Sequence, residues 1–427
     1  MDGYRAHKLV SPHPDLEPKH LSMTTTKRVA LSFLKQADLK HLAFLTGLHS
    51  TGTKSSLITT LKHELPKSRV AEVTAGSGTT PKLLSIDMGI RNLAYCVLEL
   101  HTSTDSLRQH THHAALPCSD WPGTDAARNI LPHLRLTAWH RLVVNEPSPS
   151  PFPSPTSTSA ISTPTASTTP PGYDPITYAT LAYKLISSLL LTHKPTTIII
   201  ERQRWRSGGA SSVLEWTIRV NMFEGMICAV LETLRREWEI QRGRGSAGRG
   251  SSDREVMELE QFPEVYSVSP KRVFDFWSGS NGAAGAAGVG EDDGNDKKGK
   301  EVSLKSSKAQ KLLKIGIVEG WLRGHAMNEA DGFKALDCTD DAATVRDAFL
   351  DKLSKQKGRT RAKSDGIAAN VEKIDDLADC LLQGITWVQW EANRNAVLPL
   401  LDLSEDQMSP QKEVVKRVKP SRTRKKH

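Results

Sequence analysis

Residues 83–100, LLSIDMGIRNLAYCVLEL, carry the pattern on which the predicted fold depends. Two apolar runs with strand-like composition flank a short reversal from Gly89 to Asn92, which predicts a hairpin of two buried strands. Asp87 ends the first of these strands. Asp and Gly are common turn residues, so a plain turn explains this acid when the stretch is taken by itself. The alternative is a functional carboxylate, and the remainder of the chain bears on that choice.

Apolar segments with alternating strand and helix character follow the hairpin. Three more strands are predicted within 134–144, 196–200 and 264–277. Helices are predicted at about 174–193, 211–240, 304–322, 341–354 and from 372 onward. This order of elements predicts an α/β fold with five strands and flanking helices.

Polar, low-complexity stretches interrupt these elements at 145–172, 241–255 and 278–300. Such stretches cannot bury a core, so we interpret 82–400 as one domain with insertions in its loops. The other predicted parts are a disordered or targeting segment at 1–26, a small two-helix unit at 27–66 and a basic tail at 401–427.

Composition narrows the class of protein. The 427 residues carry a formal net charge of +9, and the sequence pI is about 9.2, which favours a polyanionic partner. Nucleic acid comes first among such partners and an anionic membrane surface second. No run of 18 apolar residues exists, so we expect no membrane-spanning segment. The five cysteines form no CxxC pair, which favours a reducing compartment and argues against a zinc cluster.

Acidic residues mark the ends of three predicted elements. Asp87 ends the first strand, and Glu201 ends the strand TTIIIE. The last helix begins with Asp375, Asp376 and Asp379, and Asp379 shares a face with either neighbour, at i+3 and i+4. If the two strands lie side by side, their carboxylates meet at one edge of the sheet and the helix closes the cluster.

Clustered carboxylates repel one another, and divalent cations remove that cost. Oxygen-rich sites suit Mg²⁺, with Mn²⁺ as a substitute, and two such ions clamp a phosphodiester during in-line attack by water. A structural alternative exists for each acid. The helix macrodipole favours acids in a first turn, and Glu201 has Arg202 and Arg204 as nearby ion-pair partners.

The basic stretch RQRWRS, residues 202–207, follows Glu201 directly. Arg side chains bind phosphates in a bidentate manner, and Trp stacks on unpaired bases, so this stretch favours a nucleic-acid substrate. A solvated loop is the alternative. The nucleic-acid-binding residues predicted on this basis are Arg202, Gln203, Arg204, Trp205, Arg206, Lys271, Arg272 and Lys373.

Three motifs together, SIDMGIRNLAY (85–95), IIIERQRWRS (198–207) and KIDDLAD (373–379), resemble the fungal mitochondrial Holliday-junction resolvases. These are relatives of the bacterial junction resolvases in the RNase H-like superfamily. The resemblance extends over about 82–103, 134–144, 174–240, 264–277 and 304–390. It implies an RNase H-like fold with a mixed five-stranded sheet.

The resemblance also implies the residues of the active site and the reaction. The catalytic acids are then Asp87, Glu201, Asp376 and Asp379, and Asp375 is a further candidate metal ligand. The implied activity is Mg²⁺-dependent cleavage of four-way DNA junctions by a homodimer, through symmetric nicks that leave 5′-phosphate and 3′-hydroxyl ends. The implied location is the mitochondrion. The basic run KPSRTRKK near the C-terminus makes a nuclear address the alternative.

The predicted unit at 27–66 resembles a SAP module, a small helical DNA-binding unit. Gly47, Leu48, Gly52, Lys54 and Leu57 stand where that pattern places them. The resemblance implies a second DNA-binding surface that includes Lys54, and a plain helical hairpin is the alternative.

Three other classes of function compete with the resolvase interpretation. Sugar kinases and actin-like ATPases also end a first strand with DxG, but the chain shows no second half with their other phosphate motifs. A noncatalytic DNA-binding scaffold is another alternative, against which the acids at all three places argue. The chemically nearest competitor is an RNase H-like nuclease that cuts RNA–DNA hybrids or flaps, because the carboxylates do not distinguish these substrates.

Overall fold

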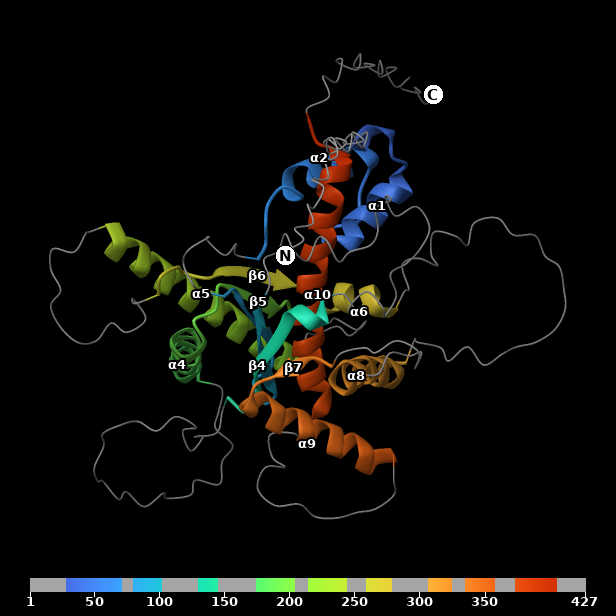
Figure 1. Cartoon of the computed structure of the whole chain (residues 1–427). Coiled ribbons are helices and arrows are strands. Elements are labelled where there is room, and N and C mark those ends of the chain that lie inside the picture. The colour runs from blue at the N-terminus through green and yellow to red at the C-terminus, as the bar shows by residue number, and fades with distance from the viewer. Residues whose placement is uncertain are drawn as a thin grey trace, which may run out of the picture.

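The computed structural model describes residues 28–70, 80–101, 130–144, 174–203, 214–243, 259–278, 306–324, 335–357 and 373–404. A mixed sheet lies at its centre (Figure 1), with the strand order β6-β5-β2-β3-β4-β7. Its strands are β2 (Lys82–Asp87), β3 (Leu93–Leu100), β4 (Leu134–Leu142), β5 (Thr197–Glu201), β6 (Glu264–Val268) and β7 (Asp337–Cys338). The α/β prediction is confirmed, and the five predicted strands form. The two-residue β7 is a sixth, which a stretch this short does not reveal by periodicity.

The pairing of β2 with its two neighbours determines the geometry of the sheet edge. β2 and β3 are antiparallel, with Ile86 opposite Tyr95, which confirms the predicted hairpin. β2 and β5 are parallel, with Ile86 opposite Ile200. The ends of β2 and β5 therefore lie next to each other, as the prediction for Asp87 and Glu201 requires.

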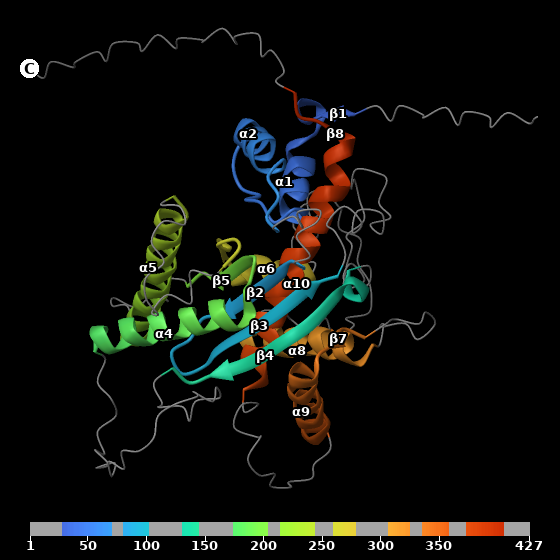
Figure 2. The same ribbon diagram turned by 60° about the vertical axis from the view of Figure 1, so that its left-hand side comes forward.

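Helices cover both faces of the sheet (Figure 2). On one face, α4 (Pro175–His193) and α5 (Glu215–Gly243) enclose a core that includes Ile86, Ile198 and Phe223. The other face carries α6 (Pro270–Ser278), α8 (Ser307–Arg323), α9 (Asp340–Lys357) and α10 (Ile374–Val397). Burial on both faces explains why β2 and β5 read as continuous apolar runs.

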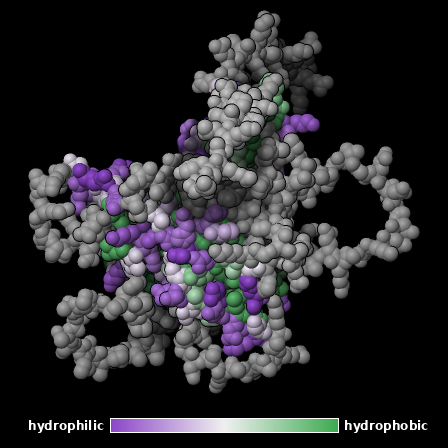
Figure 3. Space-filling view, viewed as in Figure 1, coloured by the Kyte–Doolittle hydropathy of each residue, from purple (hydrophilic) through white to green (hydrophobic). Residues whose placement is uncertain are grey.

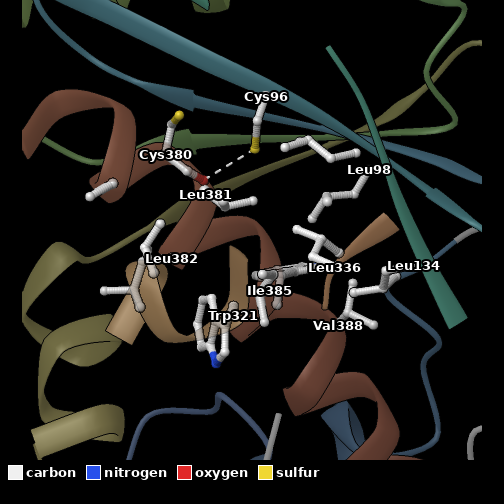
Figure 4. Close-up of a cluster of buried hydrophobic side chains, with 14 of the residues drawn as sticks. Cys96, Leu98, Leu134, Trp321, Leu336, Cys380, Leu381, Leu382, Ile385 and Val388 are labelled. Atoms are coloured by element: carbon white, nitrogen blue, oxygen red, sulfur yellow. Dashed lines mark hydrogen bonds between the residues drawn. The ribbon is translucent and has the colours of Figure 1, made fainter. Parts of the chain in front are cut away.

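Helix α10 crosses the sheet and is buried along most of its length. The hydroxyl of Ser85 donates to the Cys380 carbonyl at 2.7 Å, and the Trp139 indole donates to the Leu377 carbonyl at 3.0 Å. A Cβ on Gly384 would lie 2.9 Å from Leu98 Cδ1, so the glycine permits this close approach. Figure 4 shows the packing around Cys96 and Cys380. These contacts fix the first turns of α10 relative to β2.

The N-terminal unit consists of a 3₁₀ turn (Leu31–Phe33), α1 (Gln36–Leu45) and α2 (Lys54–Glu64). Thr53 caps α2 by accepting from the Ser56 amide. The unit packs against the C-terminal end of α10, where Val397 and Leu401 complete its core. β1 (Val29–Ala30) also pairs with β8 (Leu401–Asp402), which follows a 3₁₀ turn at Leu398–Leu400.

The folded region thus extends past the predicted boundary at 400, because Leu401 and Asp402 pair with β1. The predicted segment 1–26, the insertion 145–172 and the rest of the basic tail lie outside the described residues. The insertions at 241–255 and 278–300 do so as well, except for the ends of α5 and α6.

Among the helices in the described ranges, none has the length and apolar character to cross a membrane. On the face shown in Figure 3, hydrophilic side chains make up most of the described surface, with hydrophobic ones between them. Cys96, Cys228, Cys338 and Cys380 are free thiols, and Cys118 lies outside the described residues.

Candidate active site

Asp87 and Glu201 are the last residues of two neighbouring parallel strands. Asp87 is only 9% exposed, and its carboxyl group lies within hydrogen-bonding reach of the Glu201 carboxyl. Burial, followed by the charge of Glu201, raises the pKa of Asp87 well above its ordinary value. Two carboxylates therefore meet at a buried edge of the sheet, where folding by itself does not favour a second negative charge.

Helix α10 brings two further acids to this edge. Asp376 and Asp379 lie in the first two turns of α10, and their negative charges both raise the pKa of Asp87. Burial raises the pKa of Asp376 to about 6, and the charge of Asp375 adds to the effect. Burial also raises the pKa of Asp379 to about 6, although Lys314 opposes the shift. The predicted convergence of strand ends and helix is therefore present in the structure.

Asp375 differs from its neighbours on α10. It pairs with Lys311 of α8 at 2.5 Å, and this ammonium group outweighs the effect of burial and lowers the pKa of Asp375. This ion pair distinguishes Asp375 from Asp376 and Asp379, whose pKa values are raised, and Asp375 stays a further candidate ligand.

Three basic side chains outside the predicted site compensate the charges of the acids, namely Lys311, Lys314 and Arg141. Lys314 Nζ lies 2.6 Å from Asp379, and Arg141 Nε lies 3.6 Å from Asp376 Oδ2. Arg141 also donates to the side-chain oxygen of Asn92 at 2.7 Å. The available signals were a basic helix segment, KAQKLLK, for Lys311 and Lys314, and an Arg within a buried strand for Arg141.

The donor set suits a hard divalent cation, because carboxylate oxygens are the ligands that Mg²⁺ and Mn²⁺ prefer. Asp376 Oδ2 is buried and accepts no hydrogen bond from a described residue. Within the described ranges, no three acidic, His or Cys side chains are close enough to hold an ion as they stand. Lys314 pairs with Asp379 and Lys311 with Asp375, so these ammonium groups supply positive charge that a metal ion would otherwise supply.

The predicted nucleic-acid-binding residues next to Glu201 are partly described. The Arg202 side chain is exposed, and its backbone amide donates to the Val268 carbonyl at 2.7 Å. The Gln203 amide donates to Glu224 at 3.1 Å, and its side chain donates to Glu201 at 3.4 Å. The remaining residues of this stretch, Arg204, Trp205 and Arg206, lie outside the described residues.

The other predicted nucleic-acid contacts lie in different environments. Lys271 forms an ion pair with Asp275, one turn further along α6. Arg272 lies over the ring of Trp390 at 5.3 Å, and burial, with the charge of Arg69, lowers its pKa to about 10. Lys373 is exposed and precedes α10.

Lys54, the predicted contact in the N-terminal unit, begins α2 and is exposed. It donates to the Ser32 carbonyl at 2.7 Å.

Comparison with known proteins gives three findings. A family model described as "Mitochondrial resolvase Ydc2 / RNA splicing MRS1" matches residues 83–397. The "Cruciform cutting endonuclease 1, mitochondrial" of Schizosaccharomyces pombe (strain 972 / ATCC 24843) is 22% identical over 362 residues, which is 85% of this chain and 94% of that relative. The crystal structure of the yeast mitochondrial Holliday junction resolvase Ydc2 aligns with a TM-score of 0.44 and 20% identity, covering 84% of this chain and 95% of the other.

Proposed function

The chain belongs to the family described as mitochondrial resolvase Ydc2 / RNA splicing MRS1, and we propose that it is a mitochondrial endonuclease that resolves four-way DNA junctions. The observation that supports this activity most directly is the convergence of Asp87 and Glu201 with Asp376 and Asp379 at one buried sheet edge. The relative from S. pombe is named as a cruciform-cutting mitochondrial enzyme, which supports both the substrate and the location.

The acids would hold one or two Mg²⁺ ions, with Mn²⁺ as a substitute, and bound ions would polarise the scissile phosphate and activate water. Asp87 and Glu201 are held by strands, which gives the site a rigid base. Asp376 and Asp379 approach from α10, and Asp375 is the further candidate ligand. Lys314 and Arg141 limit repulsion among these acids before an ion binds. Hydrolysis of this kind would leave 5′-phosphate and 3′-hydroxyl ends.

A four-way junction has strands related by a two-fold axis, so paired symmetric cuts call for two active sites related in the same way. A homodimer provides them. Helix α5 offers a surface for a second copy, because Ile218 is 39% exposed and nothing described lies within 4 Å of a Cβ placed on Gly225. Leu214, just before the helix, adds to this apolar surface with 66% exposure.

The experiment is cleavage of an end-labelled synthetic four-way junction with Mg²⁺. Linear duplex, flap, RNA–DNA hybrid and structured RNA of the same sequence run alongside. The RNA arm is included because the family description also names RNA splicing. Paired, ligatable nicks confined to the junction support the proposal, and cleavage of hybrid or flap would assign the site to a different nuclease.

Tight binding of the junction without cleavage in Mg²⁺ or Mn²⁺ would contradict the enzymatic proposal and favour the noncatalytic scaffold. A matched pair of variants makes this outcome interpretable. Asp87→Asn removes a proposed ligand, whereas Asp351→Asn changes an exposed acid on α9 that pairs with Lys355. Only the first is expected to abolish cleavage.

A further inference from the structure

Three basic side chains from three separate elements lie near one another beside the candidate active site. His49 belongs to the loop between α1 and α2, Arg202 follows β5, and Arg272 lies on α6. The Arg202 amide donates to the Val268 carbonyl at 2.7 Å, and α6, which carries Arg272, begins two residues later at Pro270. His49 and Arg202 are exposed, and Arg272 is half-buried.

The loop between α1 and α2 and helix α6 both pack against Trp390 of α10. A Cβ on Gly47 would lie 2.4 Å from the Trp390 ring, so the loop packs directly on the indole. Arg272 lies over the same ring, with its guanidinium carbon 5.3 Å from the centroid. Arg69 Nη1 donates to the carbonyls of Thr46 and Gly47, each at 3.4 Å. The position of His49 therefore follows from packing on the helix that carries the catalytic acids.

The positive charge of the basic side chains beside Trp390 and Arg202 is only partly balanced. Burial, with the charges of Arg272 and Arg202, lowers the pKa of His49. Burial, with the charge of Arg69, lowers the pKa of Arg272. Arg272 Nη2 is buried and donates no hydrogen bond to a described residue. Glu224 of α5 faces Arg202 and offsets part of its charge.

We infer that His49, Arg202 and Arg272 form a phosphate-binding subsite for the DNA strand next to the candidate active site. Arg202 directly follows Glu201, so a phosphate bound here belongs to the strand that enters or leaves the catalytic acids. An anion would offset the positive charge of Arg202 and Arg272, as a cation would offset the negative charge of the acids. The N-terminal unit then contributes directly to DNA binding beside the candidate active site and does not bind DNA as an independent module. The choice of DNA as ligand rests on the proposed function.

Binding of a fluorescent four-way junction by the full chain, in EDTA so that no cleavage occurs, tests the subsite. His49→Gln, Arg202→Gln and Arg272→Gln are compared with Lys40→Gln, which removes an exposed charge from α1. We expect each subsite variant to weaken binding by roughly 3- to 10-fold, and each Arg variant to lower the slope of log K against log salt by about 1. The Lys40 variant is expected to bind within about two-fold of the unmodified chain.

A double-mutant cycle distinguishes a shared phosphate from separate contacts. The effects of His49→Gln and Arg202→Gln should be less than additive, whereas those of Lys40→Gln and Arg202→Gln should add. Additive effects in both pairs, or equal losses for His49 and Lys40, would overturn the subsite and favour an independent N-terminal module. Thermal melting checks folding, and the exposed His49 and Arg202 keep the test valid if Arg272→Gln unfolds. A chain that binds through this subsite without cutting junctions would contradict only the proposed function.

Discussion

Lys314 of α8 donates to the Asp379 carboxylate of α10 at 2.6 Å, at the edge where Asp87 and Glu201 end their strands. An ammonium group thus neutralises one of the four acids proposed to bind metal. A lysine and a metal ion compete for the same carboxylate, so the stability of this edge depends on which of them is bound.

Replacing Lys314 with Met should make the protein less stable without metal and more responsive to metal. Loss of the ammonium leaves Asp379 facing like charges, which we expect to cost roughly 1–2 kcal/mol at neutral pH. Melting temperature measured with and without Mg²⁺ checks both effects. Lys355→Met is the control, since its ion pair with Asp351 is exposed. An Mg²⁺-induced rise no larger than that of the unmodified chain would contradict the competition.

Asp87→Asn should abolish junction cleavage, preserve junction binding and stabilise the metal-free protein. Burial and the charge of Glu201 raise the pKa of Asp87, so its carboxylate destabilises the folded protein. The uncharged amide should therefore raise the free energy of unfolding by about 1 kcal/mol. Urea unfolding without metal measures the stability. Cleavage at the rate of the unmodified chain would show that Asp87 is not a ligand.

Gly384→Val should displace α10 from the sheet. Its Cβ would lie 2.9 Å from Leu98 Cδ1 and 3.4 Å from Ser85 Cβ, and overpacking of this kind costs about 1–3 kcal/mol. Cleavage should fall by more than the loss of folded protein accounts for, because the acids of α10 move with the helix. Gly316→Ala on α8 is the matched control, because its Cβ has open space and the substitution favours the helix by roughly 1 kcal/mol.

His193 should lower the stability of the protein as the pH falls from about 6.5 to 4, whereas Asp376 and Asp379, whose pKa values are raised to about 6, act in the opposite direction. Burial, then the nearby His140 and Lys82, lowers the pKa of His193 from 6.5 to about 4. His193 lies at the C-terminus of α4, where the helix dipole favours a cation, but burial has the larger effect. In this pH interval His193 binds a proton more readily in the unfolded chain than in the folded one, so this residue favours unfolding in acid.

The contribution of His193 is of the order of 1–2 kcal/mol after allowance for partial exposure. Denaturant unfolding between pH 7 and 4 measures it. His193→Gln should raise the stability at pH 4, relative to that at pH 7, compared with the unmodified chain. An unchanged slope would assign the acid sensitivity to other groups, such as His140, whose pKa burial also lowers.

The sequence was sufficient to predict the features that depend on neighbouring residues along the chain. The hairpin from 83 to 100 has both apolar strands and its turn within one stretch, and Glu201 ends a run whose β-branched residues indicate a buried strand. That these two strands lie side by side was a condition of the prediction, and the structure meets it by pairing β2 with β5 in parallel. The convergence of the acids could therefore be stated from the sequence only as a consequence of this condition.

Features that depend on partners distant in sequence were not predictable in this way. Lys314 and Arg141 acquire their roles only when α8 and β4 are placed beside α10. β7 forms through its pairing with β4, where Cys338 lies opposite Leu136. A two-residue strand is too short to show an alternating pattern in the sequence. The pairing of Asp375 with Lys311, which is 64 positions away, likewise has no signal in the local sequence.

The dependence of the N-terminal unit on the end of α10 also concerns the order in which the protein is made. Lys62 donates to the Ser404 carbonyl at 3.0 Å across 342 positions of the chain. The ribosome therefore completes α1 and α2 long before it produces the residues that close their core. The first helices to leave the ribosome are among the last to reach their final packing, and until then their apolar faces need another partner or a chaperone.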